Sequence, residues 1–104
     1  MSLGDIGNIM KQAQQLQERL AQVQDDVARR TVEAAAGGGM VKVKVNGAEE
    51  IVDIKIEKDV INPDDKGMLE DLVLAAVNEG IKKAKKLRET ELAKITGMMM
   101  PGLM

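Results

Sequence analysis

The chain has 104 residues, 44% of them hydrophobic, but it contains no Phe, Trp, Tyr, Cys or His, and Ser2 is its only serine. This composition excludes Ser-His-Asp and Cys-His catalysis and the usual zinc sites, so we expect a protein that is not an enzyme and needs no cofactor, metal or small-molecule substrate. The 15 basic and 17 acidic residues give a net charge of −2, without the strong positive charge usual in dedicated DNA-binding proteins. Because no secretory leader or bilayer-spanning apolar run is evident, we expect a cytoplasmic protein without a membrane partner. The length predicts a single domain over residues 1–104.

The first predicted element is an amphipathic helix from about residue 5 to residue 30. Apolar residues recur there at alternating steps of three and four, which is the spacing of a helix seam, and polar residues fill the positions between them. The seam consists of Ile6, Ile9, Ala13, Leu16, Leu20, Val23 and Val27.

Three strands are predicted next, over residues 31–36, 40–46 and 50–57, because apolar and polar residues alternate there. Gly37–Gly39 is interpreted as a flexible turn between the first two strands, since the Gly-Lys-Ser/Thr of a phosphate-binding loop does not follow. Asn46-Gly47 predicts a type I′ hairpin turn between the second and third strands. The inner face of the sheet is expected to be formed by Val41, Val43, Val45, Val52, Ile54 and Ile56.

A second long helix is predicted from about residue 64 to residue 96, ended by Gly97 and followed by a flexible tail over residues 97–104. At 1.5 Å per residue the two helices would be roughly 39 and 48 Å long, whereas a compact domain of this size has a radius of gyration of about 13 Å. The helices must therefore project beyond the sheet. The fold class is α+β, in the order α-β-β-β-α, and we expect a homodimer whose sheets pair and whose antiparallel helices form arms.

Three sequence blocks are similar to those of a known family. Gly7–Gln17, with the sequence GNIMKQAQQLQ, resembles the opening signature of the YbaB/EbfC family of bacterial nucleoid-associated proteins. Val41–Gly47 is similar to the central hairpin of that family, and Met68–Asn78 to its second-helix signature, in the same order along nearly the whole chain. The resemblance implies a tweezer-like homodimer that binds double-stranded DNA in the nucleoid and contributes to nucleoid organisation and gene regulation.

The candidate DNA-binding residues are the cations of the two predicted arms. The second helix carries five positive charges within seven residues, and an antiparallel first helix would add two more beside them. Taken alone, such a run is more often a solvated helix face, on which Glu79 can pair with Lys83. The family resemblance favours phosphate contacts with little sequence selectivity instead. The candidates are Lys11, Arg19, Lys82, Lys83, Lys85, Lys86, Arg88 and Lys94.

Two alternatives remain open. A protein-interaction module would use the helical arms and the Met-rich tail, because methionine side chains adapt to varied partners; the tail residues concerned are Met98, Met99, Met100 and Met104. A magnesium-dependent enzyme would use carboxylates near the start of the second helix, although acidic residues are expected there from the helix dipole alone. Those carboxylates are Asp64, Asp65, Glu70 and Asp71.

Overall fold

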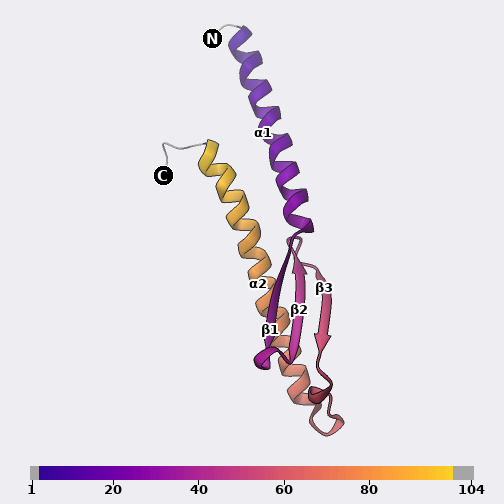
Figure 1. Ribbon diagram of the computed structural model, residues 1–104. Coiled ribbons are helices and arrows are strands. Elements are labelled where there is room, and N and C mark those ends of the chain that lie inside the picture. The colour runs from indigo at the N-terminus through magenta and orange to yellow at the C-terminus, as the bar shows by residue number, and fades with distance from the viewer. Residues whose placement is uncertain (1–2, 100–104) are drawn as a thin grey trace.

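A computed structural model describes residues 3–99 and confirms the predicted order of a long helix, a three-stranded antiparallel sheet and a second long helix (Figure 1). Short 3-10 turns connect β1 to β2 and β3 to α2. The helices and strands are α1 (Leu3–Arg29), β1 (Thr31–Ala36), β2 (Val41–Asn46), β3 (Ile51–Ile56) and α2 (Lys66–Met99), and the 3-10 turns are Gly37–Gly39, Lys58–Val60 and Pro63–Asp65.

Helix α2 continues past the residue that was predicted to end it. The helix runs through Gly97 to Met99, so the prediction that Gly97 stops it is wrong. A single glycine in a helix costs only about 1 kcal/mol relative to alanine, and Ile95, two residues before Gly97, anchors this part of the helix because it is buried. The rest of the predicted tail, including Met100 and Met104, lies outside the described residues.

The core lies between α2 and one face of the sheet. The strands follow the order β1-β2-β3, both pairs antiparallel, and α2 packs over β1 and β2 (Figure 1). The predicted burial of the three β2 valines is confirmed, since none is more than 2% exposed. The layer is thin because the buried cluster contains only small side chains, Ala34, Val41, Val43, Val45, Ala76 and Ala84.

Strand β3 differs from the prediction because its inner side chains are exposed. The register places Ile54 and Ile56 opposite buried β2 valines, on the side of the sheet that faces α2. Since α2 packs over β1 and β2, these two isoleucines remain 43% and 37% exposed. A bulge moves Val52 out of the alternation, and Ile51 takes the position opposite Val45 of β2 instead. The predicted buried face of Val52, Ile54 and Ile56 is therefore wrong for the single chain.

The connection between β2 and β3 is longer than a two-residue turn. Four residues separate the strands, and the one with a left-handed backbone is Glu49 (φ 64°), not Gly47. The side-chain oxygen of Asn46 accepts hydrogen bonds from the backbone N–H groups of Ala48 and Glu50, both at 3.0 Å. Asparagine thus organises this loop through its side chain, and the predicted type I′ turn is wrong.

Gly47 has a packing role instead. It is buried, its N–H donates to the carbonyl oxygen of Arg30 at 3.0 Å, and a Cβ atom at this position would overlap with the carbonyl oxygen of Val27. The loop therefore lies directly against the last turn of α1. This contact and the immediate continuation of α1 into β1 position the first helix relative to the sheet.

The two helices form diverging arms. They run antiparallel, and the N-terminal part of α1 extends beyond the end of α2 (Figure 1). The described chain measures 76 × 25 × 15 Å and has a radius of gyration of 20.7 Å, well above the value of about 13 Å for a compact domain of this size. Along the α1 seam, exposure rises from 2% at Val27 to 52% at Ile9. Within residues 3–99, neither helix combines the length and apolarity needed to cross a membrane.

Candidate nucleic-acid interface

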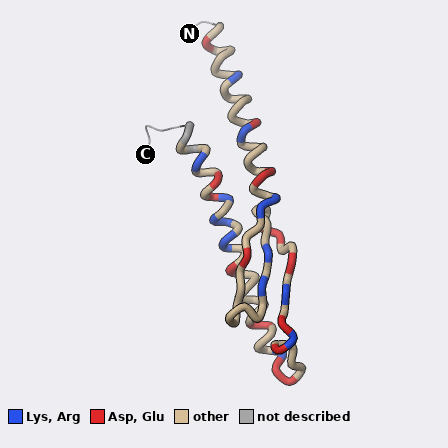
Figure 2. Tube along the Cα trace, in the orientation of Figure 1, with Lys and Arg blue, Asp and Glu red and all other residues tan. Residues whose placement is uncertain are grey.

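Figure 2 marks the positive charges along the basic segment of α2, residues 82–88. Some of these cations are paired with other groups of the protein and others are free. Lys83 Nζ donates a 3.0 Å hydrogen bond to the carbonyl oxygen of Glu33 in β1. Its ammonium group therefore binds the sheet instead of pairing with Glu79. Arg88 Nη2 lies 2.7 Å from Glu49 Oε1 in the β2–β3 loop, as an ion pair without aligned hydrogen-bond geometry. Both cations hold α2 to the sheet, which leaves them less available to a ligand.

Lys82, Lys85 and Lys86 are the free cations of this segment. All three are exposed, and within residues 3–99 none of their side chains forms a hydrogen bond or an ion pair. At 100° per residue, Lys82 and Lys86 lie on the side of α2 directly opposite the buried line of Ala76 and Ala84. They therefore point away from the sheet, where phosphate groups can approach without displacing a protein contact.

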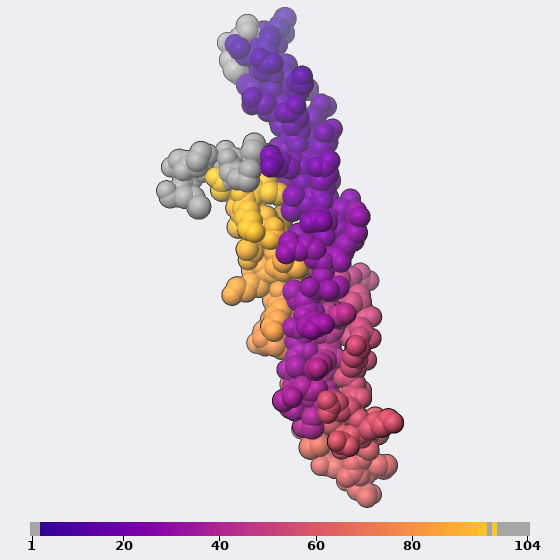
Figure 3. Space-filling view, in the orientation of Figure 1, coloured from indigo at the N-terminus to yellow at the C-terminus, as the bar shows by residue number. Residues whose placement is uncertain are grey.

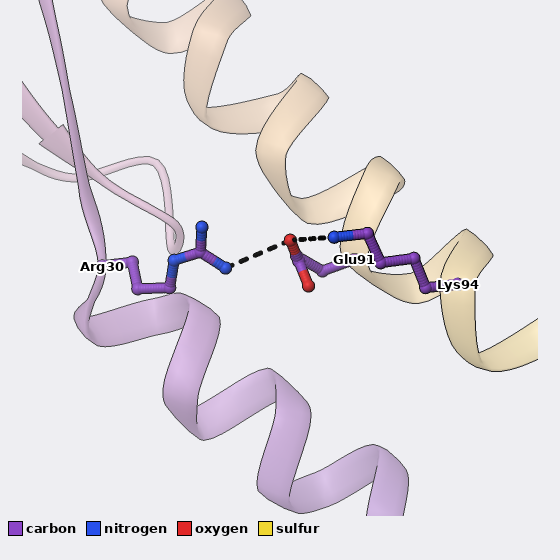
Figure 4. Close-up of polar contacts among 3 residues, drawn as sticks. All are labelled: Arg30, Glu91 and Lys94. Atoms are coloured by element: carbon purple, nitrogen blue, oxygen red, sulfur yellow. Dashed lines mark hydrogen bonds and ion pairs between the residues drawn. The ribbon is translucent and has the colours of Figure 1, made fainter.

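Lys94 belongs to a polar network between the two helices (Figure 4). Its Nζ and Arg30 Nη1 each lie 3.1 Å from the same oxygen, Oε1 of Glu91. Hydrogen bonds from Lys94 and then from Arg30 lower the pKa of Glu91 below its ordinary value. Because Arg30 follows α1 directly and Glu91 belongs to α2, the network joins the arms where they begin to diverge.

The two candidates from α1 form a separate group. Lys11 and Arg19 are both exposed, and eight residues of helix place them about 12 Å apart along its axis. Lys11 lies opposite the apolar seam, whereas Arg19 lies on its flank beside a shallow hollow lined by Gln12, Gln15 and Leu16. The eight predicted cations are thus divided between the two helices. Lys83 and Arg88 are bound to β1 and to the β2–β3 loop, and Lys94 is bound to Glu91 of its own helix.

The cations of the sheet are not among the residues predicted from the sequence. Lys42 and Lys44 alternate with the core valines of β2, and Lys55 occupies the facing strand β3. Together with Glu33 and Asp53 they line a shallow hollow. The alternation that identified the inner valines contained the signal for this outer face, because residues between inward-facing positions point to the opposite side of a sheet.

Two of the four carboxylates considered as magnesium ligands have partners at the start of α2. Asp65 Oδ1 accepts a hydrogen bond from the N–H of Met68 at 3.4 Å, and Glu70 Oε1 lies 4.0 Å from Lys66 Nζ. No group of three or more acidic side chains in the described part of the chain is arranged to hold a metal ion. These residues therefore fit a helix start rather than a metal site.

Comparison with known proteins gives consistent matches in sequence and in fold. The YbaB/EbfC DNA-binding family matches residues 2–99. The chain is 51% identical over 100 residues to a nucleoid-associated protein of Thermoanaerobacter pseudethanolicus, covering 95% of this chain and 90% of the relative. It is 55% identical over 96 residues to a nucleoid-associated protein of Thermodesulfovibrio yellowstonii, covering 92% and 84%. An uncharacterized Helicobacter pylori protein of known crystal structure shares the fold, with a TM-score of 0.74 and 24% identity over 93% of this chain and 99% of that one.

Proposed function

Because the chain belongs to the YbaB/EbfC DNA-binding family, we propose that it binds duplex DNA as a homodimer, mainly through backbone phosphates. Its close relatives are named nucleoid-associated proteins. We infer that its role is in nucleoid organisation and gene regulation. The observation that carries the phosphate mechanism is the group of free, exposed lysines Lys82, Lys85 and Lys86 on α2, of which Lys82 and Lys86 lie on the side away from the sheet.

The chemistry of this group favours phosphates over base edges. Lysine binds phosphate as a point charge and releases condensed counterions from the duplex, which makes affinity depend steeply on salt and little on sequence. Lys11 and Arg19 extend the positive charge along the other arm. Paired arms from two protomers would present two such surfaces to one duplex.

The open edge and the exposed isoleucines of strand β3 support the proposal of a homodimer. Strand β3 is an edge strand, and its isoleucines face the inner side of the sheet without a helix over them. An open edge with an apolar face is a template for a second strand and costs free energy when left in water. Pairing of β3 with β3 of a second copy would extend the sheet and cover these side chains.

The DNA proposal is tested by fluorescence anisotropy of a labelled duplex over a range of salt. Replacing Lys82, Lys85 and Lys86 with Ala should weaken binding at least about tenfold for unrelated sequences, and each lost phosphate contact should lower the slope of log affinity against log salt by about 0.9. The matched Lys→Arg triple variant keeps the charge and should bind like the wild type. Equal affinity and slope for the Ala variant would contradict the proposed surface.

The dimer proposal is tested by analytical ultracentrifugation of the wild type and of Ile54→Lys. A charge in the centre of the β3 face should yield a monomer, because an unpaired ammonium group cannot be buried in the interface. Ile9→Lys is the control, since Ile9 is 52% exposed on the α1 arm, against 43% for Ile54. A wild-type monomer at micromolar concentration, or an Ile54→Lys dimer of unchanged affinity, would refute the β3 interface.

A further inference from the structure

The outer face of the sheet carries a second group of cations. Helix α2 packs on the inner face, and in Figure 3 the strands, coloured from purple to red, reach the surface without a helix in front of them. The shallow hollow on this face is lined by Glu33, Lys42, Val43, Lys44, Asp53 and Lys55. Apart from Val43, every one of these residues is charged, and the face is open to a ligand.

The register of the strands divides these charges unequally. Lys44 lies opposite Glu33 of β1 and Asp53 of β3, and its Nζ is 3.9 Å from Glu33 Oε1. Carboxylates on both sides therefore neutralise Lys44. Lys42, in contrast, lies directly opposite Lys55 of β3, and its neighbour on the other side, in β1, is an alanine.

The pair formed by Lys42 and Lys55 is electrostatically unfavourable by itself. Residues directly opposite in an antiparallel sheet have Cβ atoms about 5 Å apart, and like charges there destabilise the pairing. Within residues 3–99, neither ammonium group forms a hydrogen bond or an ion pair that would relieve the repulsion. An anion held between the two ammonium groups would replace this repulsion with two attractive contacts.

We propose that Lys42 and Lys55 form a second phosphate-binding site, through which the protein holds a second DNA duplex. The inference rests on the proposed function, since it takes duplex DNA as the ligand. It goes further because the free α2 lysines point away from the sheet on one side, whereas Lys42 and Lys55 lie on the other side. Pairing of β3 at its edge leaves the outer face of the sheet open.

Because duplex DNA is stiff, the two sites must bind two different duplexes. The molecule is 25 × 15 Å across its long axis, whereas duplex DNA has a persistence length of about 50 nm. One duplex therefore cannot turn around so thin a body to reach both faces without a sharp kink. Two cationic faces on opposite sides make the protein a bridge between duplexes rather than a coat on one of them.

A capture experiment tests the site. A biotinylated duplex is fixed on beads, saturated with protein, washed, and then offered a fluorescent duplex of unrelated sequence. The wild type should capture the second duplex, and Lys42→Gln with Lys55→Gln should capture at least about fivefold less while binding a single duplex within about twofold of the wild type. The double Lys→Arg variant, which keeps both charges, should capture normally. The double Gln variant should melt at or above the wild-type temperature because it lacks the like-charge pair.

The outcomes separate this inference from the proposed function. A wild type that binds the first duplex but captures no second one would refute the bridge and leave DNA binding intact. A wild type that does not bind the first duplex would refute the proposed function itself. Normal capture by the double Gln variant would overturn the assignment of Lys42 and Lys55.

Discussion

Substitution of Gly80 by alanine tests the close packing of α2 on the sheet. A Cβ atom at position 80 would lie 2.6 Å from Val45 Cγ2 and 2.9 Å from Val43 Cγ2. Both methyl groups belong to buried β-branched side chains with little rotational freedom, so the helix or the strand must shift. Alanine gains about 1 kcal/mol of helix propensity over glycine, whereas overpacking a tight core costs about 1–3 kcal/mol. We therefore expect Gly80→Ala to lose about 1 kcal/mol of unfolding free energy.

Gly67 provides the matched control because it belongs to the same helix and has open space around it. No atom lies within 4 Å of a Cβ placed there, so Gly67→Ala should gain about 0.5–1 kcal/mol from propensity alone. Thermal unfolding followed by circular dichroism at a fixed protein concentration compares the two variants, and 1 kcal/mol corresponds to about 4–8 °C for a domain of this size. Stabilisation by Gly80→Ala equal to that by Gly67→Ala would refute the tight contact. Val45→Ala should cost less in the Gly80→Ala background than in the wild type.

Three further predictions concern the loop and the helix junction. Gly47→Ala should lose about 3 kcal/mol in urea denaturation, because the new Cβ meets the backbone of Val27 rather than a movable side chain; unfolding like the wild type would contradict this packing. Glu49→Val should lose about 1–2 kcal/mol, since φ is 64° at this residue, whereas Glu49→Gly should stay within about 1 kcal/mol of the wild type; equal losses would show that the left-handed backbone is not the cause. The pKa of Glu91 is lower in the folded protein than its ordinary value of 4.5, so its stabilising contribution is present above pH 4.5 and is lost as the pH falls through the folded pKa. Thermal unfolding should be measured between pH 6 and pH 3, a range that spans the ordinary glutamate pKa of about 4.5. On acidification the Glu91→Gln variant should lose less stability than the wild type.

The order of elements follows from local patterns in the sequence. Heptad spacing identified α1, alternation identified β1 and β2, and the β2 valines are buried as that alternation requires. The loop after β2 was mispredicted because Asn46 and Gly47 each have a role different from the one they play in a type I′ turn. Asn46 binds two backbone amides, and Gly47 makes room for α1, which is a contact between distant segments that no turn rule contains.

The exposure of β3 was not predictable from its own residues. Alternation assigned Ile54 and Ile56 to the inner side correctly, but whether that side is covered depends on where α2 crosses the sheet. The crossing is set by the small residues Ala76, Gly80 and Ala84, which fit against β1 and β2. A strand can thus have the pattern of a buried element and still lie uncovered in the single chain.

The candidate site was predictable as a segment but not residue by residue. Five cations in seven residues necessarily surround a helix, so some of them must face the sheet. Lys83 does so and binds the carbonyl oxygen of Glu33, and Arg88 reaches the β2–β3 loop. Only the packing of α2 distinguishes these two from the free lysines, and that packing depends on the tertiary structure.

The net charge of −2 is a poor guide to DNA binding because the fold separates the charges over a long molecule. Four acidic residues, Glu57, Asp59, Asp64 and Asp65, lie in the connection between β3 and α2, at the end of the molecule away from the arms (Figure 2). Sixteen residues of helix separate the start of α2 from Lys82, which is about 24 Å, whereas the Debye length at 0.1 M salt is about 10 Å. At that salt concentration the acidic end barely weakens the field at the free lysines. Near 0.01 M salt the Debye length grows to about 30 Å and the acidic end is felt, so the plot of log affinity against log salt should flatten there.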